Sequence, residues 1–276
     1  MDLVEAFSGR APVVVTGAGI SVASGIPTFR GTDPDAVWAK DTTELGTVRY
    51  FRRDPAGSWR WYLARFDGVR AAAPNPAHHA ITAIEAAVVA RGAPFLCVTQ
   101  NIDGLHVRAG TTGLVEIHGA ARKIRCSRNN CPNGAPSGFL AWDDAMFTAF
   151  RADPRRETVP RCPRCDAPLR AHVLWFDEMY TDHADYQFHR ALGAFGAASA
   201  LVFVGTSFSV GITALAVEAA GRARIPVFVI DPGGPPRDAV ELAAVGAIVI
   251  REPAEVVLPR VAAALGPPLD RSGLPG

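Results

Sequence analysis

Six short runs of apolar and β-branched residues constrain the fold of this chain more than any other feature of its sequence. They span residues 12–16, 94–99, 114–118, 200–205, 225–231 and 245–250. Their apolar residues follow one another without alternation, as in strands that helices cover on both faces. Alanine-rich helical stretches at 78–91, 186–198 and 213–222 separate several of the runs. This alternation predicts an α/β fold with a doubly wound parallel sheet.

The length and the charge of the chain bound its organisation and its partners. Since domains average about 150 residues, the 276 residues predict a single domain, 1–276, that carries an insert. Lys and Arg number 28 against 27 Asp and Glu, so no global positive field attracts nucleic acid or an anionic membrane. The apolar runs are shorter than the ~20 residues of a membrane helix, and the first residues lack a signal-peptide pattern. We therefore expect a cytoplasmic protein.

Two stretches interrupt the alternation of strands and helices. Residues 31–74 are rich in aromatic side chains, which predicts a small helical subdomain that caps the sheet. Residues 121–172 hold four of the five cysteines, together with Pro, Asn, Gly and Arg. Because this composition is poor in core-forming residues, the insert needs another source of stability.

The four cysteines of the insert form two close pairs, Cys126-x4-Cys131 and Cys162-x2-Cys165. Two such pairs predict a tetrahedral zinc site in a loop-built module. Four protein ligands leave no open coordination position, so the ion would be structural. Two disulfides are the alternative, but a cytoplasmic chain is kept reduced and adjacent pairs constrain little. Cys97 lies within an apolar run and is expected in the core.

A glycine-containing loop with Gly17, Ala18, Gly19 and Ser21 follows the first apolar run. The sequence predicts that a helix starts directly after this loop. Glycines in such a loop let backbone N–H groups approach a pyrophosphate, and the helix N-terminus adds favourable partial charge. The third glycine of the usual dinucleotide fingerprint is missing, so an ordinary tight turn is the alternative.

Polar clusters also follow other apolar runs, at residues 100–103, 118–119 and 205–207 and at Asp231. In an open α/β sheet the carboxyl ends of the strands form the ligand crevice, so these clusters are expected to converge there. Asp231 could accept hydrogen bonds from a ribose diol. Helix capping is the alternative for one or two of the clusters.

Several motifs in this order resemble the sirtuins: GAGIS from Gly17, GIPTFRG from Gly25, TQNIDGLH from Thr99, HG at His118, and GTSFSV from Gly205, together with the cysteine pairs. The resemblance covers nearly the whole chain. Sirtuins are NAD-dependent protein lysine deacylases with a Rossmann-type domain and a small zinc module. The resemblance therefore implies this fold, NAD as co-substrate, one structural zinc ion and acyl-lysine proteins as substrates.

The resemblance also implies site residues. The general base would be His118, which deprotonates a ribose hydroxyl, with Asn101 and Asp103 beside it in the nicotinamide-ribose pocket. A neutral imidazole suits this role, although a lone histidine at a strand end is often structural. The residues expected to hold NAD are Gly17, Ala18, Gly19, Ser21, Pro27, Phe29, Arg30, Gln100, Asn101, Ile102, Asp103, Gly205, Thr206, Ser207, Asp231 and Ala254.

Tyr62 and Arg65 are three residues apart, which places a phenol and a guanidinium on one face of a helix. In class III sirtuins the same Tyr-x-x-Arg spacing binds the carboxylate of succinyl- or malonyl-lysine, where a planar fork recognises a planar anion. We therefore expect acidic-acyl recognition beside deacetylation. A surface pair, or Arg65 stacked on Trp59 or Trp61, is the alternative.

Three positions depart from the family pattern. The stretch 169–178 usually reads LRP-x-VVWFGE, whereas here Ala171 replaces Pro and Asp177 replaces Gly. In the family this stretch pairs with the substrate backbone, here through Val173, Trp175 and Phe176. A carboxylate at Asp177 is expected to favour basic substrates and to disfavour acidic acyl groups. At position 231 the family usually has Asn, and an Asp carboxylate cannot donate a hydrogen bond.

Other functions use the same residues. Within the family, transfer of ADP-ribose to a protein or plain hydrolysis of NAD are the alternatives. From another class, the alternatives are a non-catalytic NAD sensor and a nucleic-acid reader. Nucleic acid would bind the insert, because residues 121–172 hold ten Lys and Arg against five Asp and Glu. No basic motif with interleaved aromatic residues accompanies this charge, so we expect no direct nucleic-acid binding. We also expect a monomer.

Overall fold

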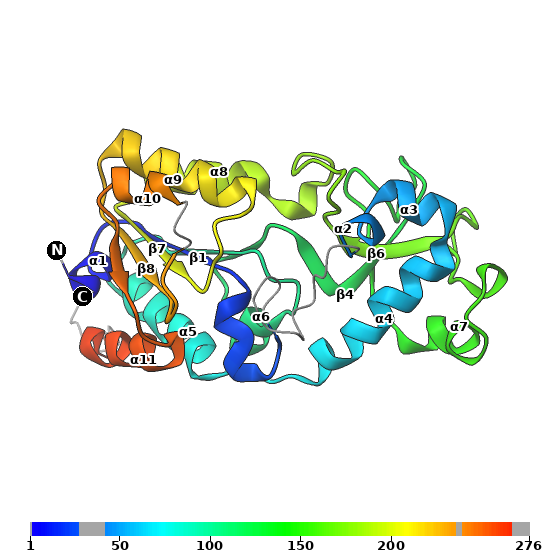
Figure 1. Cartoon of the computed structure of the whole chain (residues 1–276), viewed down its shortest axis with the longest axis horizontal. Coiled ribbons are helices and arrows are strands. Elements are labelled where there is room, and N and C mark those ends of the chain that lie inside the picture. Colours follow the sequence, from blue (N-terminus) through cyan, green and yellow to red (C-terminus); the bar gives the residue numbers. More distant parts are fainter. Residues whose placement is uncertain (1, 28–41, 236–238, 267–276) are drawn as a thin grey trace, which may run out of the picture.

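A computed structural model describes residues 2–27, 42–235 and 239–266 of the chain. The six predicted strands are confirmed, and they form one sheet in which all neighbours are parallel (Figure 1). The order is β3-β2-β1-β7-β8-β9. The strands are β1 (Pro12–Thr16), β2 (Leu96–Thr99), β3 (Leu114–Glu116), β7 (Ala200–Val204), β8 (Val227–Ile230) and β9 (Ile248–Ile250).

Helices cover both faces of this sheet (Figure 1). The helices α1 (Leu3–Phe7), α5 (Pro76–Ala90) and α11 (Ala254–Leu265) pack on one face, and α8 (Phe188–Ala197), α9 (Gly211–Ala223) and α10 (Val240–Ala244) pack on the other. Within β1, Val14 belongs to the first core, whereas Val13 and Val15 belong to the second. The strands are therefore apolar throughout because both of their faces are buried.

The strand order changes direction at β1, which pairs with β2 on one side and with β7 on the other. At such a switch point the loops after the two strands diverge and leave a crevice at the carboxyl ends. The fold therefore places the loops after β1, β2, β7 and β8 around one opening.

A second, smaller sheet is inserted after β3. It is antiparallel, with the order β5-β4-β6, and consists of β4 (Gly119–Cys126), β5 (Leu140–Ala141) and β6 (Leu169–Val173). Short helices connect its strands: η2 (Asp144–Phe147), α7 (Thr148–Ala152) and η3 (Arg156–Thr158). Elsewhere the chain forms η1 (Ala18–Ser24), α6 (Leu105–Ala109) and η4 (Ala184–Tyr186).

The aromatic stretch forms α2 (Thr42–Leu45), α3 (Val48–Arg53) and α4 (Pro55–Ala71). The expectation that it caps the large sheet is wrong, because α3 and α4 lie beside β4 and β6 of the small sheet (Figure 1). Phe51, Trp59 and Phe66 share one hydrophobic core with Ile124 and Leu169. The aromatic helices supply the core that the cysteine-rich insert lacks. Residues 31–41 of this stretch lie outside the described residues.

None of the helices in the described ranges has the length and apolarity needed to cross a membrane.

Candidate functional site

A cleft of about 980 Å³ opens at the carboxyl ends of the large sheet and continues to the aromatic helices and the segment after β6. It brings together nearly all of the site residues expected from the sequence. Those that line it are Gly17, Ala18, Gly19, Ser21, Pro27, Tyr62, Arg65, Gln100, Asn101, Ile102, Asp103, His118, Val173, Trp175, Phe176, Gly205, Thr206, Ser207 and Asp231.

Three expected cofactor residues are not among them. Phe29 and Arg30 lie outside the described residues. Ala254 is the first residue of α11, and its side chain is buried in the core between α11 and the sheet. The helix that it begins turns this methyl group inward, so the side chain does not line the cleft, and a contact of Ala254 with NAD stays a prediction.

The loops after β1 and β7 meet backbone to backbone. The N–H of Gly19 donates to the carbonyl of Gly205 at 2.8 Å, and the N–H of Gly17 donates to the carbonyl of Val204 at 3.0 Å. A Cβ atom on Gly19 would lie 2.6 Å from the Cα atom of Gly205, and Gly205 has a φ of +58°. These glycines are thus required by the contact between the two loops, and two of the N–H groups expected at a pyrophosphate already have partners.

A polar network after β2 joins these loops. The hydroxyl of Ser21 donates to a carboxylate oxygen of Asp103 at 2.7 Å, and the amide of Asn101 donates to the carbonyl of Gly17 at 3.0 Å. The amide of Gln100 donates to the hydroxyl of Thr206 at 3.1 Å. Burial raises the pKa of Asp103, while its hydrogen bonds oppose this shift. The network fixes Asn101 and Ser21 in the cleft.

His118 follows β3 and has a defined tautomer. Its Nδ1 lies 2.9 Å from the carbonyl oxygen of Gln100, which can only accept, so Nδ1 carries the proton. Burial lowers the pKa of His118 to about 4, although the bond to Gln100 raises it slightly. At neutral pH the ring is therefore neutral, and Nε2 is unprotonated and carries the lone pair that can take a proton.

The sequence analysis missed Tyr180, whose hydroxyl lies 3.4 Å from His118 Nε2. The two rings are stacked, and Tyr180 also stacks on Phe188 of α8. Tyr180 lines the cleft. No spacing rule connects it with a histidine 62 residues earlier, so only the folded chain reveals the contact.

Tyr62 and Arg65 of α4 both face the cleft, as expected from their spacing. The hydroxyl of Tyr62 accepts a hydrogen bond from Trp175 Nε1 at 2.6 Å, and burial raises the pKa of this phenol. The guanidinium of Arg65 lies 4.2 Å above the ring of Trp61, so the stacking alternative is present too. Burial lowers the pKa of Arg65, and no carboxylate within the described ranges pairs with it.

The strand β6 lies at the edge of the small sheet, and side chains contact its outer edge. The carbonyl of Leu169 accepts from Trp59 Nε1, and the carbonyls of Ala171 and Val173 accept from the guanidinium of Arg170. Alternate carbonyls of a strand point to the same edge, so side chains occupy this one. The carbonyls of Leu169, Ala171 and Val173 therefore already have donors within the chain.

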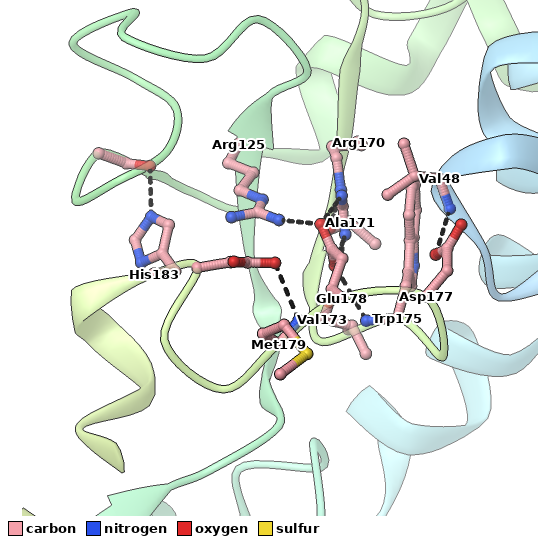
Figure 2. Close-up of polar contacts among 12 residues, drawn as sticks. Val48, Arg125, Arg170, Ala171, Val173, Trp175, Asp177, Glu178, Met179 and His183 are labelled. Carbon is pink, nitrogen blue, oxygen red and sulfur yellow. Dashed lines mark hydrogen bonds and ion pairs between the residues drawn. The ribbon is translucent and has the colours of Figure 1, made fainter. Parts of the chain in front are cut away.

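Asp177 has partners that the sequence did not predict. Its carboxylate accepts from the backbone N–H groups of Val48 at 2.7 Å and Arg49 at 3.2 Å, at the start of α3 (Figure 2). The described lining of the cleft includes Phe176 and Glu178 but not Asp177. The expectation that this carboxylate faces the substrate is therefore corrected, because α3 binds it.

Asp231, after β8, lies in the cleft and accepts from the N–H of Gly233 at 2.9 Å. Burial raises its pKa, against the effect of the N–H groups of Gly233 and Gly234. One carboxylate oxygen thus orders the loop, while the group remains an acceptor.

The four cysteines of the insert come together. Their sulfur atoms all lie within 4.8 Å of one another, and none forms a disulfide. The shortest contacts cross between the two sequence pairs: Cys126 to Cys165 at 3.4 Å and Cys131 to Cys162 at 3.7 Å. Four convergent, free thiols on one small module suit a single structural zinc ion, and no disulfide joins them in this structure.

Comparison with known proteins places this geometry in context. The model of the Sir2 family matches residues 17–211. A protein of Thermus thermophilus named NAD-dependent protein deacylase is 40% identical over 198 residues, which cover 71% of this chain and 69% of that protein. The mitochondrial NAD-dependent protein deacylase sirtuin-5 of Danio rerio is 39% identical over 175 residues, covering 60% and 56%. The crystal structure of a Sir2 homolog–NAD complex superposes with a TM-score of 0.76 at 30% identity, covering 96% and 94%.

Proposed function

The chain belongs to the Sir2 family of NAD-dependent protein deacylases, and we propose that it removes acyl groups from protein lysines, releasing nicotinamide and O-acyl-ADP-ribose. The observation that carries this proposal is His118, a neutral imidazole that lines the cleft and whose Nδ1–H is bound by the carbonyl of Gln100, which leaves Nε2 unprotonated. A binding module needs no such base, which disfavours a non-catalytic NAD sensor.

NAD, when bound, supplies an anomeric carbon whose bond to nicotinamide breaks as the acyl oxygen attacks. His118 Nε2 would accept the proton of a ribose hydroxyl, which then attacks the acyl carbon, and a water molecule would complete the release of free lysine and O-acyl-ADP-ribose. Gln100 keeps the proton of the imidazole on Nδ1 throughout. Asn101, Ser21 and Asp103 form one hydrogen-bonded unit that orders the ribose end of the cleft. A zinc ion held by the thiols of Cys126, Cys131, Cys162 and Cys165 would have no open coordination position, so its contribution would be structural.

We also propose that the enzyme accepts succinyl- and malonyl-lysine. Arg65 brings a positive charge without a described carboxylate partner to the cleft, and Tyr62 retains a hydroxyl proton to donate. The carboxylate of Asp177 is bound at α3, which removes the main objection to an acidic acyl group. A half-buried, planar guanidinium beside a phenol suits a small carboxylate.

The products of the reaction test the proposal. The protein is incubated with NAD and an acetyl-lysine peptide, and the mixture is analysed by mass spectrometry. Nicotinamide, deacylated peptide and O-acetyl-ADP-ribose in equal amounts support deacylation. ADP-ribosylated protein would instead indicate transfer of ADP-ribose, and free ADP-ribose formed without peptide would indicate hydrolysis of NAD.

A further inference from the structure

The segment after β6 carries two adjacent carboxylates, Asp177 and Glu178, that are bound on opposite sides. Figure 2 shows Glu178 directed to Arg125 and Arg170 of the small sheet, and Asp177 directed to Val48 of α3. Val173, the last residue of β6, lines the cleft together with Leu174, Trp175, Phe176 and Glu178 of this segment. Its conformation therefore shapes one wall of the site.

Glu178 is held by two buried guanidinium groups. One of its oxygens accepts from Arg125 and from Arg170, each at 2.6 Å, and the other accepts from Arg170 at 2.9 Å. The side chains of Arg125, Arg170 and Glu178 are only 3%, 5% and 8% exposed. Burial raises the pKa of Glu178, but the two arginines outweigh burial and keep it below its usual value. The carboxylate is thus charged and fixed in place.

This ion cluster fixes the backbone of the segment as well. Glu178 also accepts from the backbone N–H of Trp175 at 3.0 Å, which closes a tight turn. Arg170 donates to the carbonyl of Val173 at 2.8 Å, and its guanidinium lies 3.2 Å from the centre of the Trp175 ring. Arg170 therefore binds both ends of the stretch 173–178, the carbonyl of Val173 at one end and the carboxylate of Glu178 at the other.

On the other side, the segment is bound to the aromatic helices. Asp177 accepts from Val48 and Arg49, and the N–H of Phe176 donates to the carbonyl of Gly46 at 3.0 Å. The carboxylate of Asp177 accepts charge-assisted hydrogen bonds from two backbone N–H groups at the start of α3, as the side chain of an N-cap residue does. Asp177 lies 129 residues after Val48 in the sequence. Asp177 thus connects the cleft wall with the helix that precedes Tyr62 and Arg65.

We propose that Asp177 and Glu178 are positioning residues that hold the stretch 173–176 between the small sheet and α3, and so determine affinity for the acyl-lysine peptide. This inference rests on the proposed function. In this proposal Asp177, which departs from the family pattern, fixes the position of residues 173–176. It does not interact with charged residues of the substrate.

The first test uses Asp177→Ala, with Glu44→Gln as a matched control that removes one exposed carboxylate beside α3. In the free protein, we expect Asp177→Ala to accelerate hydrogen exchange at the N–H groups of Val48, Arg49 and Phe176. The KM for an acetyl-lysine peptide should rise about fivefold, as expected for loss of a helix cap, with the KM for NAD unchanged. Glu44→Gln should change neither quantity.

Peptides of different charge distinguish a positioning role of Asp177 from direct recognition of the charge of the substrate. With Asp177→Ala, the KM should rise by the same factor for peptides with acidic and with basic residues beside the lysine. A factor that depends on peptide charge would overturn the proposal, as would unchanged hydrogen exchange at α3. The exchange measurement needs no substrate, so it still decides this inference if the protein fails to deacylate any peptide.

Glu178→Gln provides a second test on the other side of the segment. The amide preserves size but leaves Arg125 and Arg170 without a counter-charge, so we expect a lower Tm and a larger rise in peptide KM than for Asp177→Ala. Faster exchange at Trp175 should accompany it. A fall in kcat with unchanged peptide KM would contradict a positioning role.

Discussion

The Nδ1 atom of His118 lies 2.9 Å from the carbonyl oxygen of Gln100, and this one contact determines which ring nitrogen can act as a base. Gln100 belongs to the polar loop after β2, so the cofactor side of the cleft also orients the base. Burial then lowers the pKa of His118 to about 4. Both effects keep Nε2 unprotonated over the physiological range.

The pH dependence of kcat/KM should reflect this environment. Because the folded protein holds His118 neutral down to a pKa of about 4 instead of 6.5, we expect no loss of kcat/KM from protonation of the base between pH 7.5 and 5.5. An acetyl-lysine peptide is the substrate, since its acyl group does not titrate. A decline centred near pH 6.5, with the fold intact by circular dichroism, would show that the base is not buried as described.

The stability of the fold should depend on pH through three histidines in addition to His118. Burial lowers the pKa of His78 and of His172 to about 4 and that of His106 to about 3, from 6.5. The unfolded chain therefore binds protons that the folded chain does not, and the free energy of unfolding falls as pH decreases from 6.5 towards 4. The slope is about 1.4 kcal/mol per pH unit for each histidine. Urea denaturation at several pH values measures it, and a flat profile would refute it.

The contact between the glycine loops predicts a severe effect of one methyl group. Gly205→Ala places a Cβ atom 2.5 Å from the carbonyl carbon of Gly19 at a φ of +58°, and we expect it to cost about 3 kcal/mol and to weaken NAD binding. The control is Gly193→Ala in the middle of α8, where a Cβ atom meets nothing within 4 Å. This change should stabilise the protein by about 0.5–1 kcal/mol. Equal Tm values for the two variants would argue against the described loop contact.

The sequence predicts the elements of this fold well, because strand positions follow from uninterrupted apolar runs and the zinc ligands follow from cysteine spacing. It also predicts that the polar loops after β1, β2, β7 and β8 converge, since parallel strands end at one edge. Long-range pairings are not encoded in any local pattern. The bond from Val48 to Asp177, the contact of Tyr180 with His118 and the packing of the aromatic helices on the small sheet all depend on tertiary structure.

The acyl preference can be tested at Arg65. Arg65→Met keeps an apolar chain over Trp61 but removes the charge, so kcat/KM for a succinyl-lysine peptide should fall at least about tenfold more than for the acetyl-lysine peptide. The ratio of the two kcat/KM values is the quantity to compare between the variant and the unmodified protein. Equal losses on both substrates would assign Arg65 to packing on Trp61 alone.

The most direct measurement of the central claim compares the unmodified protein with His118→Ala in a single assay. Each is incubated with NAD and an acetyl-lysine peptide, O-acetyl-ADP-ribose is quantified by mass spectrometry, and NAD binding is measured by calorimetry. We expect the product to form with the unmodified protein and to be lost in His118→Ala while NAD still binds. Formation of O-acetyl-ADP-ribose at an undiminished rate by His118→Ala would contradict the assignment of His118 as the base.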